Sequence, residues 1–330
     1  MTPPSLFTLD DLNLRVRHRR TERTLVRDAS LNVAAAESVG LVGESGSGKS
    51  MSIKSAMRLL PRGVTAEGRI EFDGRDVLSY NRADLAHYRS RDVAMIHQDP
   101  RAYINPTRTI SQFLTEGAVH TGQMSRDEAI ERACALMADV GIAGAHRRLE
   151  QFPHQLSGGL LQRVMIVAAL LPSPRLIFAD EPTTALDVTV QSDVMAILLE
   201  QIRDRHVSML FVTHDLDLAA AVTDRLAVMY AGSIVETGTS AEIYSRPLHP
   251  YTAGLLQSRP STTGVHRLTA IPGRPIAAYE ADEGCSFAPR CAFATDQCRT
   301  SRPRSRTVEG RSVACHRVEE IADDLKDRAS

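Results

Sequence analysis

Short apolar runs alternate with helical patterns over most of this 330-residue chain. The runs at 38–42, 93–96, 176–179 and 208–212 predict buried strands. Apolar residues recur at helical spacing over 50–60, 109–149, 157–171 and 191–203. Because buried strands that alternate with helices are typical of a parallel sheet, we expect an α/β core. Shorter alternating sets at 7–16, 25–33 and 68–74 predict antiparallel strands beside that core.

The first buried strand leads directly into a glycine-rich loop that fits the phosphate-loop pattern. Its glycines allow a tight turn in which successive backbone amides point at the oxygens of a triphosphate. The lysine adds a positive charge near the β and γ phosphates, and the final serine can offer its hydroxyl to Mg²⁺. The residues of this nucleotide site are Gly43, Glu44, Ser45, Gly46, Ser47, Gly48, Lys49 and Ser50.

Composition narrows the class of protein. A hydrophobic fraction of 43% can fill a core, and a formal net charge of -1 gives no pull toward nucleic acid or anionic membranes. Lysine occurs only at positions 49, 54 and 326, so the lysine of the loop is not incidental. The N-terminus lacks the basic start and apolar block of a signal peptide, and the longest apolar run, 164–171, is far shorter than the roughly 20 residues of a membrane helix. We expect a soluble, cytosolic chain.

Polar side chains follow several of the predicted strands. Gln98 ends one strand and can coordinate Mg²⁺ and the attacking water. Asp180 and Glu181 end another, where Asp180 can hold Mg²⁺ through water and Glu181 can polarise the attacking water. His214 follows a third strand, and we expect it to contact the γ-phosphate.

A second glycine motif begins the helix at 157–171. Ser157 is predicted to cap that helix, and Gly158 and Gly159 let an anion approach its first turn.

Together these motifs resemble the ATP-binding subunits of ABC transporters over most of the chain. The resemblance implies two such chains stacked head to tail, so that Ser157 to Gly159 act on the nucleotide of the partner. It adds Asp187 to the site and places the aromatic residue that stacks on adenine at His18, which departs from the usual pattern. Leu160 stands where a glutamine is common; we do not infer a dead site from it.

The last third resembles the oligopeptide/dipeptide importer branch through the segments at 248–252, 272–275, 284–291 and 313–316. That branch implies a related second ATPase, two membrane permeases and an extracytoplasmic peptide-binding protein, with no nucleic acid as partner. It also implies a peripheral position on the cytoplasmic face of the cell membrane.

Four cysteines lie close together in an Arg-rich segment with little apolar periodicity: Cys285, Cys291, Cys298 and Cys315. Bound metal can close loops that packing cannot. Zinc sites normally show cysteine pairs two to four residues apart, whereas this wider spacing suits an iron–sulfur cluster. The resemblance also indicates a [4Fe-4S] cluster, with Zn²⁺ and unligated thiols as alternatives. The fifth cysteine, Cys134, lies in an apolar helical pattern and is predicted to be a buried core thiol.

The expected architecture is an ABC-type nucleotide-binding domain at 1–260, with a RecA-like core, an antiparallel β subdomain and a helical insertion at about 99–170, followed by a small Cys-rich extension at 261–330. The expected function is ATP hydrolysis that powers import of peptides or related small solutes. Two alternatives are an ABC-type ATPase acting on DNA and a cysteine-cluster redox-regulated ATPase. The first is disfavoured because no heptad run or long insertion splits the core.

Overall fold

A computed structural model describes residues 5–18, 21–184, 187–258 and 270–329. The chain forms two compact units. The first comprises Ala34–Glu37 and Ser79–Leu210, and the second comprises Ser5–Val33, Ser38–Leu78 and Phe211 onward. Each unit is built from segments that are distant in sequence.

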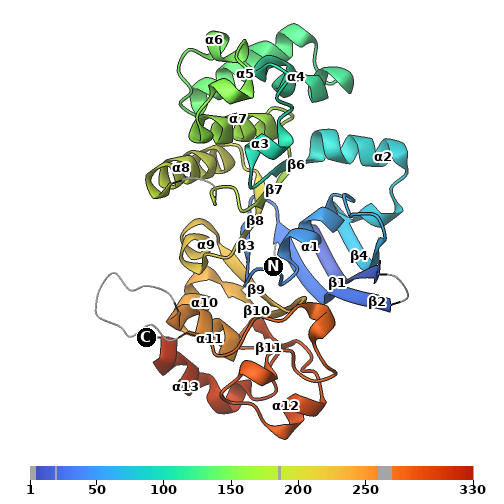
Figure 1. Cartoon of the computed structure of the whole chain (residues 1–330), viewed down its shortest axis with the longest axis vertical. Coiled ribbons are helices and arrows are strands. Elements are labelled where there is room, and N and C mark those ends of the chain that lie inside the picture. The colour runs from blue at the N-terminus through green and yellow to red at the C-terminus, as the bar shows by residue number, and fades with distance from the viewer. Residues whose placement is uncertain (1–4, 19–20, 185–186, 259–269, 330) are drawn as a thin grey trace. The chain divides into compact units, whose positions relative to one another are not determined.

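An antiparallel sheet forms one part of the second unit (Figure 1). Its strand order is β2-β1-β4-β5, formed by β2 (Thr21–Ala34), β1 (Ser5–His18), β4 (Val64–Phe72) and β5 (Arg75–Asp76). The register between β1 and β4 shifts between Asp10 and Asn13, as in a β-bulge. Gly68 lies against this bulge, because a Cβ there would come within 2.3 Å of the Asp11 carbonyl oxygen. The strands predicted at 7–16, 25–33 and 68–74 are therefore confirmed, with longer bounds.

The same unit contains a mixed set of strands that begins with the strand before the glycine-rich loop. β3 (Ser38–Val42) pairs parallel with β9 (Arg225–Tyr230), which pairs antiparallel with β10 (Ser233–Thr239). β12 (Arg311–Val313) pairs with β10 and with β11 (Arg306–Val308). The helices of this unit are α1 (Lys49–Ala56), α9 (Leu216–Val222), α10 (Ser240–Ser245), α11 (Pro250–Gln257), α12 (Asp296–Thr300) and α13 (Val318–Ala329).

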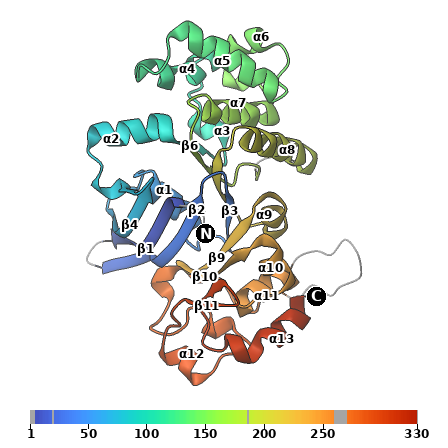
Figure 2. The same cartoon turned by 180° about the vertical axis from the view of Figure 1, so that it is seen from behind.

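The last described segment packs onto α11 rather than standing apart (Figure 2). Ala253 on α11 forms a buried cluster with Ile321 and Leu325 on α13, and Leu248 forms another with Val313 and Val318. Through these apolar contacts, residues from the last quarter of the chain belong to the hydrophobic core of this unit.

The first unit consists mainly of helices with two parallel strands. β6 (Val93–Ile96) pairs with β7 (Leu176–Asp180), as their apolar runs predict. β8 (Ser208–Thr213) begins in this unit and ends in the other. The helices are α2 (Arg82–His87), α3 (Pro100–Tyr103), α4 (Ile110–His120), α5 (Arg126–Asp139), α6 (Ala145–Leu149), α7 (Gly158–Leu170) and α8 (Val188–Asp204). In the described residues, no helix is both long and apolar enough to cross a membrane.

The prediction that Cys134 is a buried core thiol is wrong. Its neighbours Ala133 and Met137 on α5 are fully buried, whereas Cys134 points to the flank of that face and is only half-buried. Its Sγ lies 3.7 Å from Nδ1 of His146. One residue step on a helix turns the side chain by about 100°, and this moves Cys134 off the apolar stripe.

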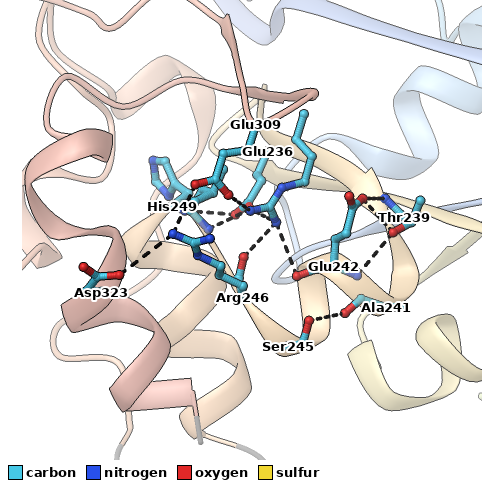
Figure 3. Close-up of polar contacts among 11 residues, drawn as sticks. Glu236, Thr239, Ala241, Glu242, Ser245, Arg246, His249, Glu309 and Asp323 are labelled. Atoms are coloured by element: carbon cyan, nitrogen blue, oxygen red, sulfur yellow. Dashed lines mark hydrogen bonds and ion pairs between the residues drawn. The ribbon is translucent and has the colours of Figure 1, made fainter.

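A buried carboxylate links the C-terminal strands to the rest of the second unit. The Glu236 side chain on β10 accepts hydrogen bonds from the backbone N–H groups of Leu248 (2.8 Å) and His249 (2.9 Å). Arg311 on β12, also buried, lies 3.6 Å from Glu236 and donates to the carbonyl oxygen of Arg246 at 2.7 Å. Figure 3 shows Glu236 and His249 at the centre of this cluster, with the Arg246–Glu309 ion pair beside them.

Candidate functional site

The glycine-rich loop joins β3 to α1 in the second unit, as the sequence predicts. Gly43 has φ 156°, and a Cβ there would lie 2.1 Å from the carbonyl oxygen of Met229, so no other residue fits. Gly48 has φ 110° and caps the N-terminus of α1, which begins at Lys49. A tight glycine loop that leads straight into the N-terminus of a helix is the arrangement that binds phosphate oxygens.

Two polar side chains of the loop are held inside it. The ammonium of Lys49 is buried and donates to the carbonyl oxygens of Gly43 (2.7 Å) and Glu44 (3.0 Å). The hydroxyl of Ser47 is buried, and no hydrogen-bond partner for it exists among the described atoms. Buried hydroxyls are normally satisfied, so the unpartnered Ser47 fits a loop whose remaining partner is an anion.

Residues far away in sequence hold Glu44, the second residue of the loop. Its backbone N–H donates to the hydroxyl of Tyr251 at 2.9 Å. Its carboxylate forms a bidentate ion pair with Arg290, at 2.7 and 3.1 Å. The sequence does not predict Tyr251 and Arg290 as neighbours of the loop, because no motif or spacing connects positions separated by 207 and 246 residues.

The first unit brings Gln98 and Glu181 together. Each follows one of the paired parallel strands β6 and β7, whose register places Ile96 opposite Ala179. Gln98 Nε2 donates to Glu181 Oε2 at 3.3 Å, and the Thr184 hydroxyl donates to the same oxygen at 3.1 Å. Glu181 has φ 46°, a left-handed conformation that costs a non-glycine residue of order 1 kcal/mol and is typical of functional sites.

The second glycine motif starts α7 in the same unit. Ser157 caps the helix, its hydroxyl accepting from the N–H of Leu160, as predicted. Gly159 permits close packing on α8, since a Cβ would lie 2.7 Å from Val190 Cγ1. Asp187 caps α8 by accepting from the N–H of Val190 at 3.0 Å. Ser157 and Asp187 thus lie at the N-termini of two packed helices.

The expected nucleotide contacts remain predictions, including those of His18, His214 and Asp180. His18 is the last residue of β1, and its side chain lies outside the part of the chain that the structure describes. His214 directly follows β8 and is exposed. Asp180, the last residue of β7, is half-buried.

The four C-terminal cysteines line one small cavity in the second unit, together with Phe287, His249 and other residues. All four are free thiols. Burial raises the pKa of Cys291 to about 11 and that of Cys315 to about 12. Among the described residues, no three His, Cys, Asp or Glu side chains are arranged to hold a metal ion. The geometry therefore does not support binding of a single metal ion by the four cysteines.

Comparison with known proteins matches two families. Residues 26–184 match "ABC transporter", and residues 235–298 match "Oligopeptide/dipeptide transporter, C-terminal region". The oligopeptide transport ATP-binding protein AppD of Bacillus subtilis is 40% identical, over 89% of this chain and 91% of its own length. The dipeptide transport ATP-binding protein DppD of Haemophilus influenzae is also 40% identical, over 94% of this chain and 95% of its own length.

A solved structure shares the fold. The dimeric ATP-binding cassette MJ0796, in a post-hydrolysis state with ADP and phosphate, superposes with a TM-score of 0.63 and 24% identity, covering 71% of this chain and 98% of the cassette. The nucleotide-binding fold that the sequence predicts is thereby confirmed. With its phosphate loop, its second glycine motif and close relatives along nearly its whole length, the chain belongs to the ABC transporter family, among the ATP-binding proteins of oligopeptide and dipeptide transport.

Proposed function

We propose that this chain is the ATP-hydrolysing subunit that powers import of peptides, or related small solutes, across the cytoplasmic membrane. The observation that carries the proposal is the pairing of Gln98 with Glu181 at the ends of adjacent parallel strands, in a chain that also has a complete phosphate loop. The names of its relatives support peptides as the cargo. Neither alternative, an ATPase acting on DNA or a redox-regulated ATPase, is favoured by these relatives.

Each site residue has a distinct part in this proposal. The loop amides and Lys49 would bind the triphosphate, and Ser50, Gln98 and Asp180 would hold Mg²⁺, which would supply positive charge to the phosphates. Glu181 orients the attacking water, and its hydrogen bonds from Gln98 and Thr184 fix the carboxylate for that task. His214 contacts the γ-phosphate, and His18 stacks on adenine.

The second glycine motif acts in trans. Ser157, Gly158 and Gly159 at the start of α7, with Asp187 at the start of α8, complete the site of a second, related ATPase subunit. The helix N-termini there favour an anion. We propose two permeases and an extracytoplasmic peptide-binding protein as the remaining partners, with the chain bound peripherally at the cytoplasmic face of the cell membrane.

Substitution of Glu181 tests the proposal. Glu181→Gln keeps the shape but removes the negative charge that orients water, so we expect ATP binding to be retained and turnover in the assembled transporter to fall at least a hundredfold, since positioning and electrostatics supply most of the catalysis in phosphoryl transfer. Lys49→Ala removes a buried contact of the phosphate loop, and we expect it to weaken nucleotide binding itself.

Glu200→Gln on α8 is the control, because Glu200 is exposed and far along the helix from Asp187. Steady-state ATPase assays and nucleotide titrations give the two readouts. Near-normal hydrolysis by Glu181→Gln would remove Glu181 from the catalytic role.

We further propose that residues 261–330 are an extension of the ATPase domain (1–260) and that its four cysteines hold a [4Fe-4S] cluster. Buried thiols with raised pKa values lie around one cavity, and coordination would stabilise them as thiolates. A single Zn²⁺ requires four sulfurs at about 2.3 Å from one point, whereas a cluster tolerates wider separation. The wide spacing of the four cysteines along the sequence is what favours the larger group over zinc.

A further inference from the structure

Glu44 of the phosphate loop is held by a side chain from the cysteine-containing segment. Arg290 Nη1 donates to Oε2 of Glu44 at 2.7 Å, and Nη2 donates to Oε1 at 3.1 Å. The Arg290 side chain is 5% exposed and that of Glu44 is 23% exposed. A bidentate pair with this burial fixes direction as well as charge, unlike an ordinary surface ion pair.

Arg290 is itself rigidly placed. Its third donor, Nε, is bonded to the carbonyl oxygen of Pro272 at 2.8 Å. Its guanidinium carbon lies 5.8 Å from the centre of the Tyr230 ring and 6.0 Å from that of Phe287. Both contacts are within the range of cation–π attraction. The fork presented to Glu44 is therefore oriented by contacts within the chain itself.

The contacts of Glu44 lead directly to the loop lysine. The Tyr251 hydroxyl accepts from the Glu44 N–H, and Lys49 Nζ donates to the Glu44 carbonyl oxygen. Glu44 is thus held at its side chain, its amide and its carbonyl, and the last contact is with the cation that the loop offers to phosphate. A displacement of Glu44 would move Lys49 or break its hydrogen bond.

Glu44 places a negative charge in the loop that is proposed to bind a triphosphate. A carboxylate beside a site for a triphosphate repels the ligand, and repulsion between like charges in a partly buried place costs more than at the surface. We infer that Arg290 is a positioning residue, which sets the affinity of the phosphate loop for nucleoside triphosphates by fixing and neutralising Glu44. This inference rests on the phosphate loop of the proposed function and is independent of whether the cysteines bind a cluster.

The test measures affinity and stability separately on the full chain. Titration with a non-hydrolysable ATP analogue and Mg²⁺ gives the dissociation constant, and urea unfolding gives the stability. We expect Arg290→Ala to weaken binding by about tenfold, because Glu44 is left unneutralised beside the ligand. Arg290→Lys keeps the charge but loses the fork, so its effect is expected to be smaller.

The decisive variant is the double substitution Glu44→Gln with Arg290→Ala. Removing the carboxylate removes the repulsion, so most of the lost affinity is expected to return, although the buried contacts are not restored. A purely structural role of Arg290 predicts the opposite, with affinity no better than in Arg290→Ala. Lack of recovery in the double variant, or unchanged affinity in Arg290→Ala, would overturn the inference.

Arg274 provides a matched control, since it forms a bidentate pair with Glu280 in the same segment and is largely exposed. Arg274→Ala is expected to leave the dissociation constant unchanged. Lys49→Ala distinguishes the role of the phosphate loop in nucleotide binding from the role of Arg290. If Lys49→Ala weakens binding and Arg290→Ala does not, only the inference about Arg290 fails; if Lys49→Ala also has no effect, the phosphate loop itself is not the binding site.

Discussion

Glu236 shows how one buried carboxylate can connect three segments. Burial raises its pKa, and the backbone hydrogen bonds from Leu248 and His249, with the Arg311 charge, oppose that rise. The Glu236 carboxylate accepts hydrogen bonds from the N–H groups of Leu248 and His249, which directly precede α11. It therefore acts as a cap for that helix from a distant position in the sequence. Arg311 then ties the cap to α10 through the carbonyl oxygen of Arg246.

Removal of Arg311 leaves Glu236 buried without its charge partner. We expect Arg311→Ala to lower the free energy of unfolding by about 3–5 kcal/mol, the usual effect of breaking a buried pair. Urea unfolding of the full chain measures it. Arg306→Ala on the neighbouring strand β11 breaks an exposed pair with Glu319 of α13, and as the control it should have little effect. Equal effects of the two substitutions would contradict the assigned role of Glu236.

Because the pKa of Glu236 is raised in the folded chain, its contribution to folding stability depends on pH. The folded chain holds the Glu236 proton more tightly than the unfolded chain does, so this contribution to stability is present below a pH of about 4.3 and is lost as pH rises through the raised value. In Arg311→Ala the pKa rises further, and the loss should extend to higher pH.

At the scale of single residues, the sequence predicts which residues belong to the nucleotide site better than it predicts which residues contact one another. Gln98 and Glu181 could be placed at neighbouring strand ends because buried parallel strands are recognisable from continuous apolar runs. Arg290 could not be linked to Glu44, since a bidentate pair depends on the fold of a segment without periodicity. For Cys134 the apolar pattern predicts burial wrongly, because a shift of one position on a helix moves a side chain from the core to the flank.

Among the elements, the turn between Cys285 and Cys291 is of special interest. The 3-10 helix η5 (Ala288–Arg290) is closed at both ends by backbone hydrogen bonds, from Ala288 to Cys285 and from Cys291 to Ala288. Cys285 N–H also donates to the carbonyl oxygen of Cys298 at 2.8 Å. Three of the four proposed ligands are thus linked through short backbone contacts.

Metal analysis tests the proposed cluster. We expect protein purified without oxygen to contain about four iron and four sulfide per chain and to absorb visible light. Cys291→Ser should lose both, because one thiolate ligand is removed, whereas Cys134→Ser should retain them, since Cys134 lies in the other compact unit. A colourless protein with one zinc and no iron would reject the cluster while leaving the four ligands in place.

The sequence predicts the ends of the buried strands more accurately than the end of the helix that follows the phosphate loop. β6 and β7 agree closely with the apolar runs, since continuous burial specifies a strand end to end. The helix predicted to reach residue 60 ends at Ala56, because Arg58 adopts φ 50° and the chain turns before Pro61. A positive φ at an arginine has no signal in the sequence.

At the scale of the whole molecule, we propose that a permease binds at the exposed aromatic residue that follows Gln98. Tyr103 on α3 is 51% exposed and stacks on His97, with ring centres 3.5 Å apart. Because α3 directly follows Gln98, a partner bound there would act on the residue that contacts Glu181.

Site-specific crosslinking in the assembled transporter checks this placement. A photoreactive residue at position 103 is expected to capture a permease. Val119, also exposed but at the end of α4, is the control position, where capture should be weak. Capture of the other ATPase alone from position 103 would contradict the proposed docking surface.

The separation of Glu44 and Arg290 also has a consequence for how the protein is made. Ribosomes add about 5–20 residues per second, so the 246 positions between them correspond to roughly 12–50 seconds of synthesis. During that interval a nascent phosphate loop carries an uncompensated carboxylate, and its affinity for ATP should be low. The full affinity for ATP would then be reached only when the last quarter of the chain has emerged, so that incomplete subunits bind the nucleotide less tightly than finished ones.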